Sequence, residues 1–240
     1  MKARLDRLLV ERGLAPTREK AQALIMAGEV LVDGRKAEKS GQPVDAEGRI
    51  EILAQPPFVG RGGLKLDAAI AHFGIRVAGR ICLDIGASTG GFTDCLLQRG
   101  AARVHAVDVG TGQLDWKIRS DPRVVVHEKL NARYLRPEDL GVPIDLAVCD
   151  VSFISATLIL PAVNPVLQPD GEMVILVKPQ FEAGKGQVGK GGIVREPELH
   201  QAACRRVDDA ARQLGFETSI IESPILGAEG NKEFLLYAHR

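Results

Sequence analysis

Four charged residues stand next to apolar stretches in a way that suits proton transfer. Asp150 follows "IDLAVC" and Lys178 follows "EMVILV", so each comes directly after a predicted strand. Glu233 lies at the start of the last predicted strand, and Lys65 lies in a predicted helix ahead of the first strand of the larger domain. A lysine beside carboxylates can accept a proton when its surroundings favour its neutral form. For each residue alone a solvated surface charge is the better interpretation, so a site is indicated only if the four converge.

The elements that would position these residues alternate between strand and helix. This alternation is typical of a parallel sheet with helices on both faces. Ligands of such sheets bind at the carboxyl ends of the strands, where Asp150 and Lys178 lie. The predicted strands span residues 80–86, 103–110, 123–132, 144–152 and 172–179, and the predicted helices span residues 90–101, 156–169 and 197–215.

The last part of the chain predicts two more strands, over residues 216–225 and 231–240. The stretch "PILGAEGN" between them is long enough for an antiparallel hairpin and too short for a crossover between parallel strands. Glu233 would then begin an antiparallel strand and lie at the same edge as Asp150 and Lys178. The predicted fold class is therefore α/β, and the mostly parallel sheet with an antiparallel last strand resembles the Rossmann-like fold of class I methyltransferases.

A glycine-rich turn, "LDIGASTGGF", joins the first of these strands to a helix. Its glycines allow the backbone to turn sharply and to approach a ligand closely. Asp84 ends the strand, where a carboxylate suits a cationic ligand better than a pyrophosphate, and Asp108 ends the next strand, where it suits ribose hydroxyls. S-adenosylmethionine fits both features, whereas a turn that binds nothing is the alternative. The candidate cofactor contacts are Asp84, Gly86, Ser88, Gly90, Gly91, Phe92, Asp108, Val109 and Asn131.

A second glycine-rich stretch, "GKGQVGKG" at residues 184–191, nearly matches a phosphate-binding loop. The hydroxyl residue that would bind magnesium is replaced by Gly191, so a solvated loop is the favoured interpretation. A secondary interpretation is that Lys185 and Lys190 contact nucleic-acid phosphates.

Residues 1 to about 53 predict a separate small α+β unit. The pattern indicates helices over 5–13 and 18–28, a hairpin over 29–38 and a strand over 49–54. Up to residue 40 this unit holds nine Lys and Arg residues against six Asp and Glu residues, a mild basic excess. The candidate phosphate contacts are Arg4, Arg18, Lys20 and Arg35.

Composition excludes several classes of protein. The formal net charge is zero, so a nucleic-acid partner would have to bind a local basic face. The four cysteines form no C-x-x-C pair, and no cluster of cysteine and histidine has metal-ligand spacing, so we expect reduced thiols and no metal. No apolar run approaches the roughly 20 residues that span a bilayer. We therefore expect a cytoplasmic protein without a membrane partner.

The four charged residues match, in order and context, the Lys-Asp-Lys-Glu tetrad of FtsJ-type ribose 2′-O-methyltransferases. The matching stretches are "RGGLKL", "CDVSFIS", "LVKPQFEAG" and "NKEFLL". The whole chain resembles the TlyA/hemolysin-A-like family, and "RLDRLLVERGLAPTREKAQALIMAGEVLVDG" resembles an RNA-binding domain first named in a ribosomal protein. The resemblance implies an RNA-binding domain at 1–58, a hinge at 59–63 and a methyltransferase domain at 64–240. It also implies methyl transfer from S-adenosylmethionine to a ribose 2′-hydroxyl, with ribosomal RNA or ribosomal subunits as partner and cytidine as the expected nucleotide.

On the family's terms we assign Lys178 as the base and Asp150 as the residue that orients it. Lys65 and Glu233 would position the ribose. Three other functions stay open: a base N-methyltransferase, because "DVSF" is loosely similar to a motif that stacks a planar target; a non-catalytic RNA-binding or haemolysin-like protein; and a methyltransferase for a small molecule.

Overall fold

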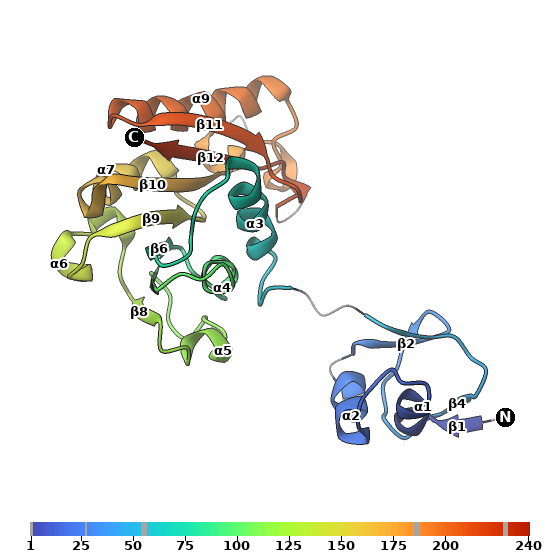
Figure 1. Cartoon of the computed structure of the whole chain (residues 1–240). Coiled ribbons are helices and arrows are strands. Elements are labelled where there is room, and N and C mark those ends of the chain that lie inside the picture. Colours follow the sequence, from blue (N-terminus) through green and yellow to red (C-terminus); the bar gives the residue numbers. More distant parts are fainter. Residues whose placement is uncertain (1, 27, 54–56, 185–187, 228–229) are drawn as a thin grey trace. The chain divides into compact units, whose positions relative to one another are not determined.

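The computed structural model describes residues 2–26, 28–53, 57–184, 188–227 and 230–240 (Figure 1). The chain forms two compact units, Met1–Pro56 and Pro57–Arg240, each with its own core. Helix α3 (Gly62–Phe73) opens the larger unit and takes in the last two residues of the expected hinge at 59–63.

The small unit contains the two predicted helices, α1 (Leu5–Glu11) and α2 (Arg18–Met26), which pack against each other. Leu5 and Leu9 lie one turn apart on the same face of α1 and are fully buried. The predicted hairpin is present, while the pairing of the chain's first strand with residues 43–45 was not anticipated. The described strands are β1 (Lys2–Arg4), β2 (Val30–Val32), β3 (Arg35–Lys36), β4 (Pro43–Asp45) and β5 (Ile50–Ile52).

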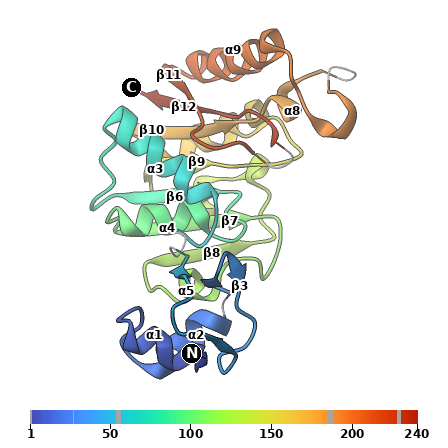
Figure 2. The same cartoon turned by 90° about the vertical axis from the view of Figure 1, so that its right-hand side faces the viewer.

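The larger unit is built on a seven-stranded sheet within the described residues, with the order β11-β12-β10-β9-β6-β7-β8 (Figure 2). As predicted, the sheet is parallel except for β12, which runs antiparallel between β10 and β11. The predicted α/β fold, with a mostly parallel sheet and an antiparallel last strand, is thus confirmed. The strands are β6 (Ile81–Ile85), β7 (Arg103–Asp108), β8 (Val124–Glu128), β9 (Ile144–Cys149), β10 (Leu167–Val177), β11 (Glu217–Glu222) and β12 (Phe234–His239).

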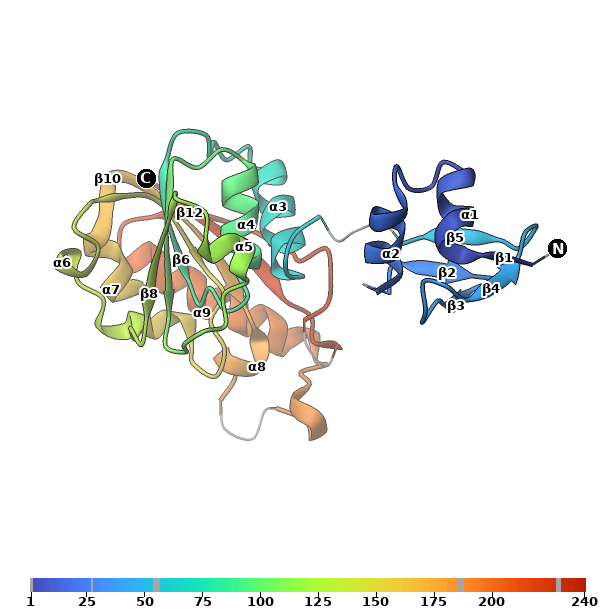
Figure 3. The same cartoon turned by 90° about the horizontal axis from the view of Figure 1, so that it is seen from below.

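Helices cover both faces of this sheet (Figure 3). The alternation of side chains explains how one strand serves two cores: in β9, Leu146 and Val148 pack with α3 and α4, while Ala147 and Cys149 pack on the opposite face. The other helices are α4 (Gly91–Gln98), α5 (Trp116–Arg119), α6 (Pro137–Leu140), α7 (Leu160–Val163), α8 (Pro179–Glu182) and α9 (Pro197–Gln213), with 3-10 turns η1 (Ala132–Tyr134), η2 (Ala156–Leu158), η3 (Asn164–Val166) and η4 (Lys190–Gly192).

The prediction of a mostly helical stretch over 156–169 is wrong in its continuity. The chain there forms η2, α7 and η3 in succession, and β10 already begins at Leu167. Pro161 and Pro165 each lie at the start of one of the short helices, where a residue without an N–H is tolerated. Each proline therefore ends the preceding turn and begins a new one.

Candidate active site

The strand ends bring the four charged residues to one edge of the sheet. Asp150 follows the last residue of β9, and Lys178 follows the last residue of β10. Because Val177 pairs with Phe234, the antiparallel β12 places Glu233 beside the end of β10. Helix α3 supplies Lys65, whose ammonium reaches Glu233. The convergence expected from the sequence is therefore present.

The four side chains form two ion pairs. Lys65 Nζ lies 2.5 Å from Glu233 Oε2, and the exposed fractions of the two side chains are 9% and 2%. Lys178 Nζ lies 2.6 Å from Asp150 Oδ1, in an ion pair that does not have the angles of a hydrogen bond. Lys178 Nζ also donates a hydrogen bond of 2.9 Å to Ser152 Oγ. The first pair is a buried anchor, whereas the second is open to a neighbouring cavity.

The glycine turn lies at the same edge, next to Asp150. Gly86 has φ +82°, and a methyl group added to it would lie 2.4 Å from the carbonyl oxygen of Asp150. Gly90 has φ +94°, and a methyl group there would lie 2.9 Å from the side chain of Leu114. Each of the two positions therefore favours glycine for two reasons: the backbone has a positive φ, and there is little room for a side chain.

Two cavities meet at this edge. The larger, which we call the turn cavity, holds about 470 Å³ and is lined by Gly86, Ser88, Asp108, Val109, Asn131 and Asp150 among others. The second, which we call the tetrad cavity, holds about 390 Å³ and is lined by Lys65, Lys178, Gln180 and Glu233 among others. Ser152 and Phe153 line both cavities, so the two are adjacent. A smaller space of about 120 Å³ beside the turn is lined by Gly86, Ser88, Gly91, Phe92 and Asp150 among others.

Asp84 and Gly90 are the candidate cofactor contacts that line none of these spaces. Asp84 is fully buried behind the turn, where Thr93 Oγ1 donates a hydrogen bond of 2.6 Å to its Oδ2. Its other oxygen, Oδ1, has no hydrogen-bond partner among the described residues. Burial, reinforced by the nearby charges of Asp150 and Asp108, raises the pKa of Asp84 to about 7.

Asp108 holds the loop that forms the wall of the turn cavity. Its Oδ2 accepts a hydrogen bond of 2.8 Å from the Ser88 amide, and its Oδ1 accepts one of 2.7 Å from the Gly110 amide. Asn131 Oδ1 accepts a hydrogen bond from the amide of Arg133 and so caps η1. These polar groups are thus fixed by the backbone before any ligand binds.

The sequence pointed to Phe153 only as the last residue of "DVSF", and it did not point to Glu182. Phe153 has φ +65° and a side chain 91% exposed, with its ring centroid 5.3 Å from that of Phe181. Glu182 is buried and accepts hydrogen bonds of 2.5 Å from Ser155 Oγ and 2.7 Å from the Ala156 amide. Glu182 therefore ties the segment after Lys178 to the segment after Asp150. A glutamate four residues beyond the lysine was the only sequence signal.

The candidate phosphate contacts lie in the small unit. Lys20 and Arg35 are exposed, and Arg4 and Arg18 form ion pairs with the buried Asp6. In the stretch "GKGQVGKG", which nearly matches a phosphate-binding loop, Lys185 lies outside the described residues. Within the described residues there is no cluster of three or more metal-binding side chains, and no helix is long and apolar enough to cross a membrane.

Residues 58–240 match the family of FtsJ-like methyltransferases, and residues 3–50 match the S4 domain. This chain belongs to the FtsJ-like methyltransferase family. Its larger unit also shares its fold with an S-adenosylmethionine-dependent methyltransferase from Mesorhizobium loti, at a TM-score of 0.53 and 16% identity over 72% of this chain and 96% of that one. The sheet edge described above therefore lies within the part of the chain that matches the FtsJ-like methyltransferases.

Full-length relatives of this FtsJ-like methyltransferase carry two kinds of name. It is 48% identical to the 16S/23S rRNA (cytidine-2′-O)-methyltransferase TlyA of Mycobacterium tuberculosis, over 98% of this chain and 89% of the relative. It is 44% identical to Hemolysin A of Brachyspira hyodysenteriae, over 98% of both chains. A solved structure from Streptococcus thermophilus that carries a hemolysin name covers 100% of this chain and 88% of its own, at 45% identity and a TM-score of 0.76.

Proposed function

We propose that this protein transfers a methyl group from S-adenosylmethionine to the ribose 2′-hydroxyl of a cytidine in ribosomal RNA. The observation that carries the proposal is the pair of lysine–carboxylate contacts at a cavity adjacent to the glycine turn. The name of the Mycobacterium tuberculosis relative supports the cytidine and the ribosomal RNA. An enzyme with this substrate works where ribosomes are, so we also propose a cytoplasmic location.

The residues at the turn suit S-adenosylmethionine. Gly86 and Ser88 line the turn cavity together with the carboxylates of Asp108 and Asp150, and Asp84 is buried behind the turn. Such a site favours a ligand with positive charge and repels a pyrophosphate. S-adenosylmethionine supplies an electrophilic methyl group on a positively charged sulfur.

In the proposed mechanism a neutral Lys178 would take the proton of the ribose 2′-hydroxyl, so that this oxygen could displace the methyl group from the sulfur, which would leave with the electron pair of the broken carbon–sulfur bond. Asp150 and Ser152 fix the direction of the Lys178 amine and stabilise it once it carries the proton. The buried Lys65–Glu233 pair holds the ribose in place, because neither side chain can move without breaking the other's contact. Holding the oxygen close to the methyl group supplies a large part of the rate enhancement.

Phe153 suits contact with a nucleobase. An exposed aromatic ring at a point where both cavities meet offers a face on which a base can stack. Replacing Phe153 with Ala should raise the KM for RNA by about five- to hundredfold, the range expected for one lost base–aromatic stack. Phe153→Tyr keeps an aromatic face and should keep the wild-type KM. Equal KM values for the Ala and wild-type proteins, measured by initial rates over a range of RNA concentrations, would remove Phe153 from the RNA site.

The raised pKa of Asp84 predicts how cofactor affinity depends on pH. Below about pH 7 the carboxyl is mostly protonated, so it puts no negative charge behind the turn to attract a cationic cofactor. If only the ionised form binds, affinity for S-adenosylmethionine should rise about tenfold between about pH 6 and pH 8. Calorimetric titration across this range should show the rise in wild type and a flat profile in Asp84→Asn. A rise of equal size in both proteins would assign it to another group.

The raised pKa of Asp84 also makes the stability of the cofactor-free protein depend on pH, but in the opposite direction: stability should fall as the pH rises. Because the pKa of Asp84 is raised from 3.8 to about 7 on folding, the folded state binds the proton more tightly than the unfolded state. The stabilisation from the protonated carboxyl is complete below about pH 4 and is lost as the pH rises through about 7. Thermal unfolding of wild type relative to Asp84→Asn, measured without cofactor, should show this loss.

The decisive test of the proposed function is to incubate the protein with labelled S-adenosylmethionine and bacterial ribosomal subunits or deproteinised ribosomal RNA. Digestion to nucleosides should recover the label as 2′-O-methylcytidine. Label on a base instead would favour the base N-methyltransferase, and no label in RNA under any of these conditions would contradict the proposal.

A further inference from the structure

A buried carboxylate lies behind two exposed arginines in the small unit. Asp6, in the first turn of α1, has no exposed side-chain surface. It accepts hydrogen bonds from Arg4 Nε at 3.1 Å and Arg4 Nη2 at 3.0 Å, from Arg18 Nε at 2.8 Å and from Gln22 Nε2 at 3.0 Å. Asp6 thus connects residues from β1 and α2 through one carboxylate.

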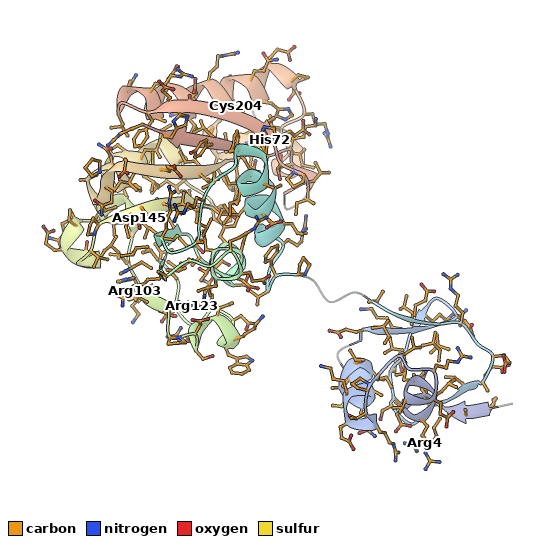
Figure 4. All side chains as sticks on the ribbon, viewed as in Figure 1. Arg4, His72, Arg103, Arg123, Asp145 and Cys204 are labelled. Atoms are coloured by element: carbon orange, nitrogen blue, oxygen red, sulfur yellow. The ribbon has the colours of Figure 1, made fainter. Side chains whose placement is uncertain are left out.

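The two arginines keep an unused edge. A guanidinium has five N–H donors, and Asp6 engages two from Arg4 and one from Arg18. Arg4 Nη1 and both Nη atoms of Arg18 donate no hydrogen bond within the described residues, while the side chains are 46% and 43% exposed. Figure 4 shows Arg4 at the surface of the small unit. A methyl group on Gly41 would lie 3.0 Å from Arg4 Nη1, so the guanidinium rests against backbone on one side.

The charge state of this cluster is fixed. The hydrogen bond from Arg4 holds the pKa of Asp6 well below its usual range, although burial opposes this, and the same contact raises the pKa of Arg4. The carboxylate is therefore ionised at any pH where the protein functions, and it cancels one of the two positive charges. On charge alone, Asp6 should weaken the binding of any polyanion.

We propose that Asp6 is a positioning residue for RNA binding: it fixes Arg4 and Arg18 so that their unused N–H groups together meet phosphates of the RNA backbone. This inference rests on the proposed function in taking RNA as the partner. Two guanidiniums held in place lose little conformational entropy on binding, and paired N–H groups bind phosphate strongly. The affinity gained by holding the two guanidiniums in place exceeds the affinity lost when Asp6 cancels one positive charge.

The direction in which Asp6→Asn changes the affinity for RNA shows whether the placement of the arginines or the net charge matters more. In the full chain, Asp6→Asn adds one unit of positive charge but should lower affinity for deproteinised bacterial ribosomal RNA by about tenfold at about 100 mM salt, as two phosphate contacts weaken. Glu11→Gln makes the same change of charge at an exposed position of the same helix and should leave affinity unchanged or raise it. Filter binding measures both. Affinity equal to or above wild type for Asp6→Asn overturns the proposal.

A double-mutant cycle tests whether Asp6 acts through the arginines. In an Arg4→Ala/Arg18→Ala protein, Asp6→Asn should cause no further loss of affinity, whereas independent effects would add and so contradict the proposal. Circular dichroism and thermal unfolding check that each variant is folded. If Asp6→Asn does not fold, Arg4→Lys/Arg18→Lys keeps Asp6 and the net charge but removes the planar donor geometry. That variant should bind about tenfold more weakly, and wild-type affinity would overturn the proposal.

The result is distinguishable from a failure of the proposed function. Binding is measured without methyl transfer, so RNA that binds normally but receives no methyl group counts against the reaction alone. A wild-type protein that does not bind ribosomal RNA at all counts against both.

Discussion

An enzyme with Lys178 replaced by Ala is expected to transfer methyl groups to RNA about 10²- to 10⁴-fold more slowly than wild type, which is the usual contribution of a general base. Lys178 lines the tetrad cavity and not the turn cavity, so affinity for S-adenosylmethionine should change little. Single-turnover transfer of labelled methyl and calorimetric titration of the cofactor measure the two quantities separately.

Lys178→Arg distinguishes a base from a fixed positive charge. Arginine keeps the charge beside Asp150 but cannot give up its proton in a protein. We expect Lys178→Arg to be as inactive as Lys178→Ala. Lys232→Ala is a matched control, because Lys232 forms an exposed ion pair with Glu222 close to the site in sequence. Near-normal rates for Lys178→Arg would show that Lys178 acts only by its charge and that the base is another group.

Of the substitutions proposed here, Glu233→Ala should lower the free energy of unfolding the most. It leaves the ammonium of Lys65 buried without its carboxylate, and removing one partner of a buried pair costs about 3–5 kcal/mol. For a domain of this size we expect thermal unfolding to begin roughly 10 °C lower. Methyl transfer should be lost as well, since Lys65 can no longer hold its position in the tetrad cavity.

A paired substitution separates these two effects. Lys65→Met with Glu233→Leu removes both charges and fills a similar volume, so stability should return to within about 2 kcal/mol of wild type. Activity should stay absent, because the groups that hold the ribose are gone. Recovery of activity together with stability would mean that the pair serves only to support the fold.

The directions of the strands and the edge of the sheet at which the candidate site lies were largely predictable from the chain. Apolar stretches of strand length, each followed by a polar residue, placed Asp150 and Lys178 at one edge, and the short connection before β12 predicted the antiparallel strand that brings Glu233 there. These features depend on local pattern and on the handedness and packing rules of parallel sheets, which a single sequence carries.

The contact between Lys65 and Glu233 was not predictable from spacing. The family resemblance implied that Asp150 orients Lys178, and the two do form an ion pair. The contact of Lys65 with Glu233 depends on the path of α3 across the sheet edge, which nothing in the spacing of these residues encodes. The same holds for Asp6, which reads as an ordinary acidic residue in a first helical turn but is buried under two arginines. The sequence indicates Phe153 only as the last residue of "DVSF", and its left-handed backbone and exposed ring could not be predicted from that pattern.

The place of β12 has a consequence for how the protein becomes active during synthesis. The tetrad begins at Lys65 but is completed only by Glu233, and β12 inserts between two strands made earlier. Domains fold in the order in which they leave the ribosome, so the small unit can fold well before the catalytic site exists. If the protein acts as proposed, a nascent chain that still lacks Glu233 and β12 would bind ribosomal RNA without modifying it, and it would compete with the finished enzyme for the same RNA.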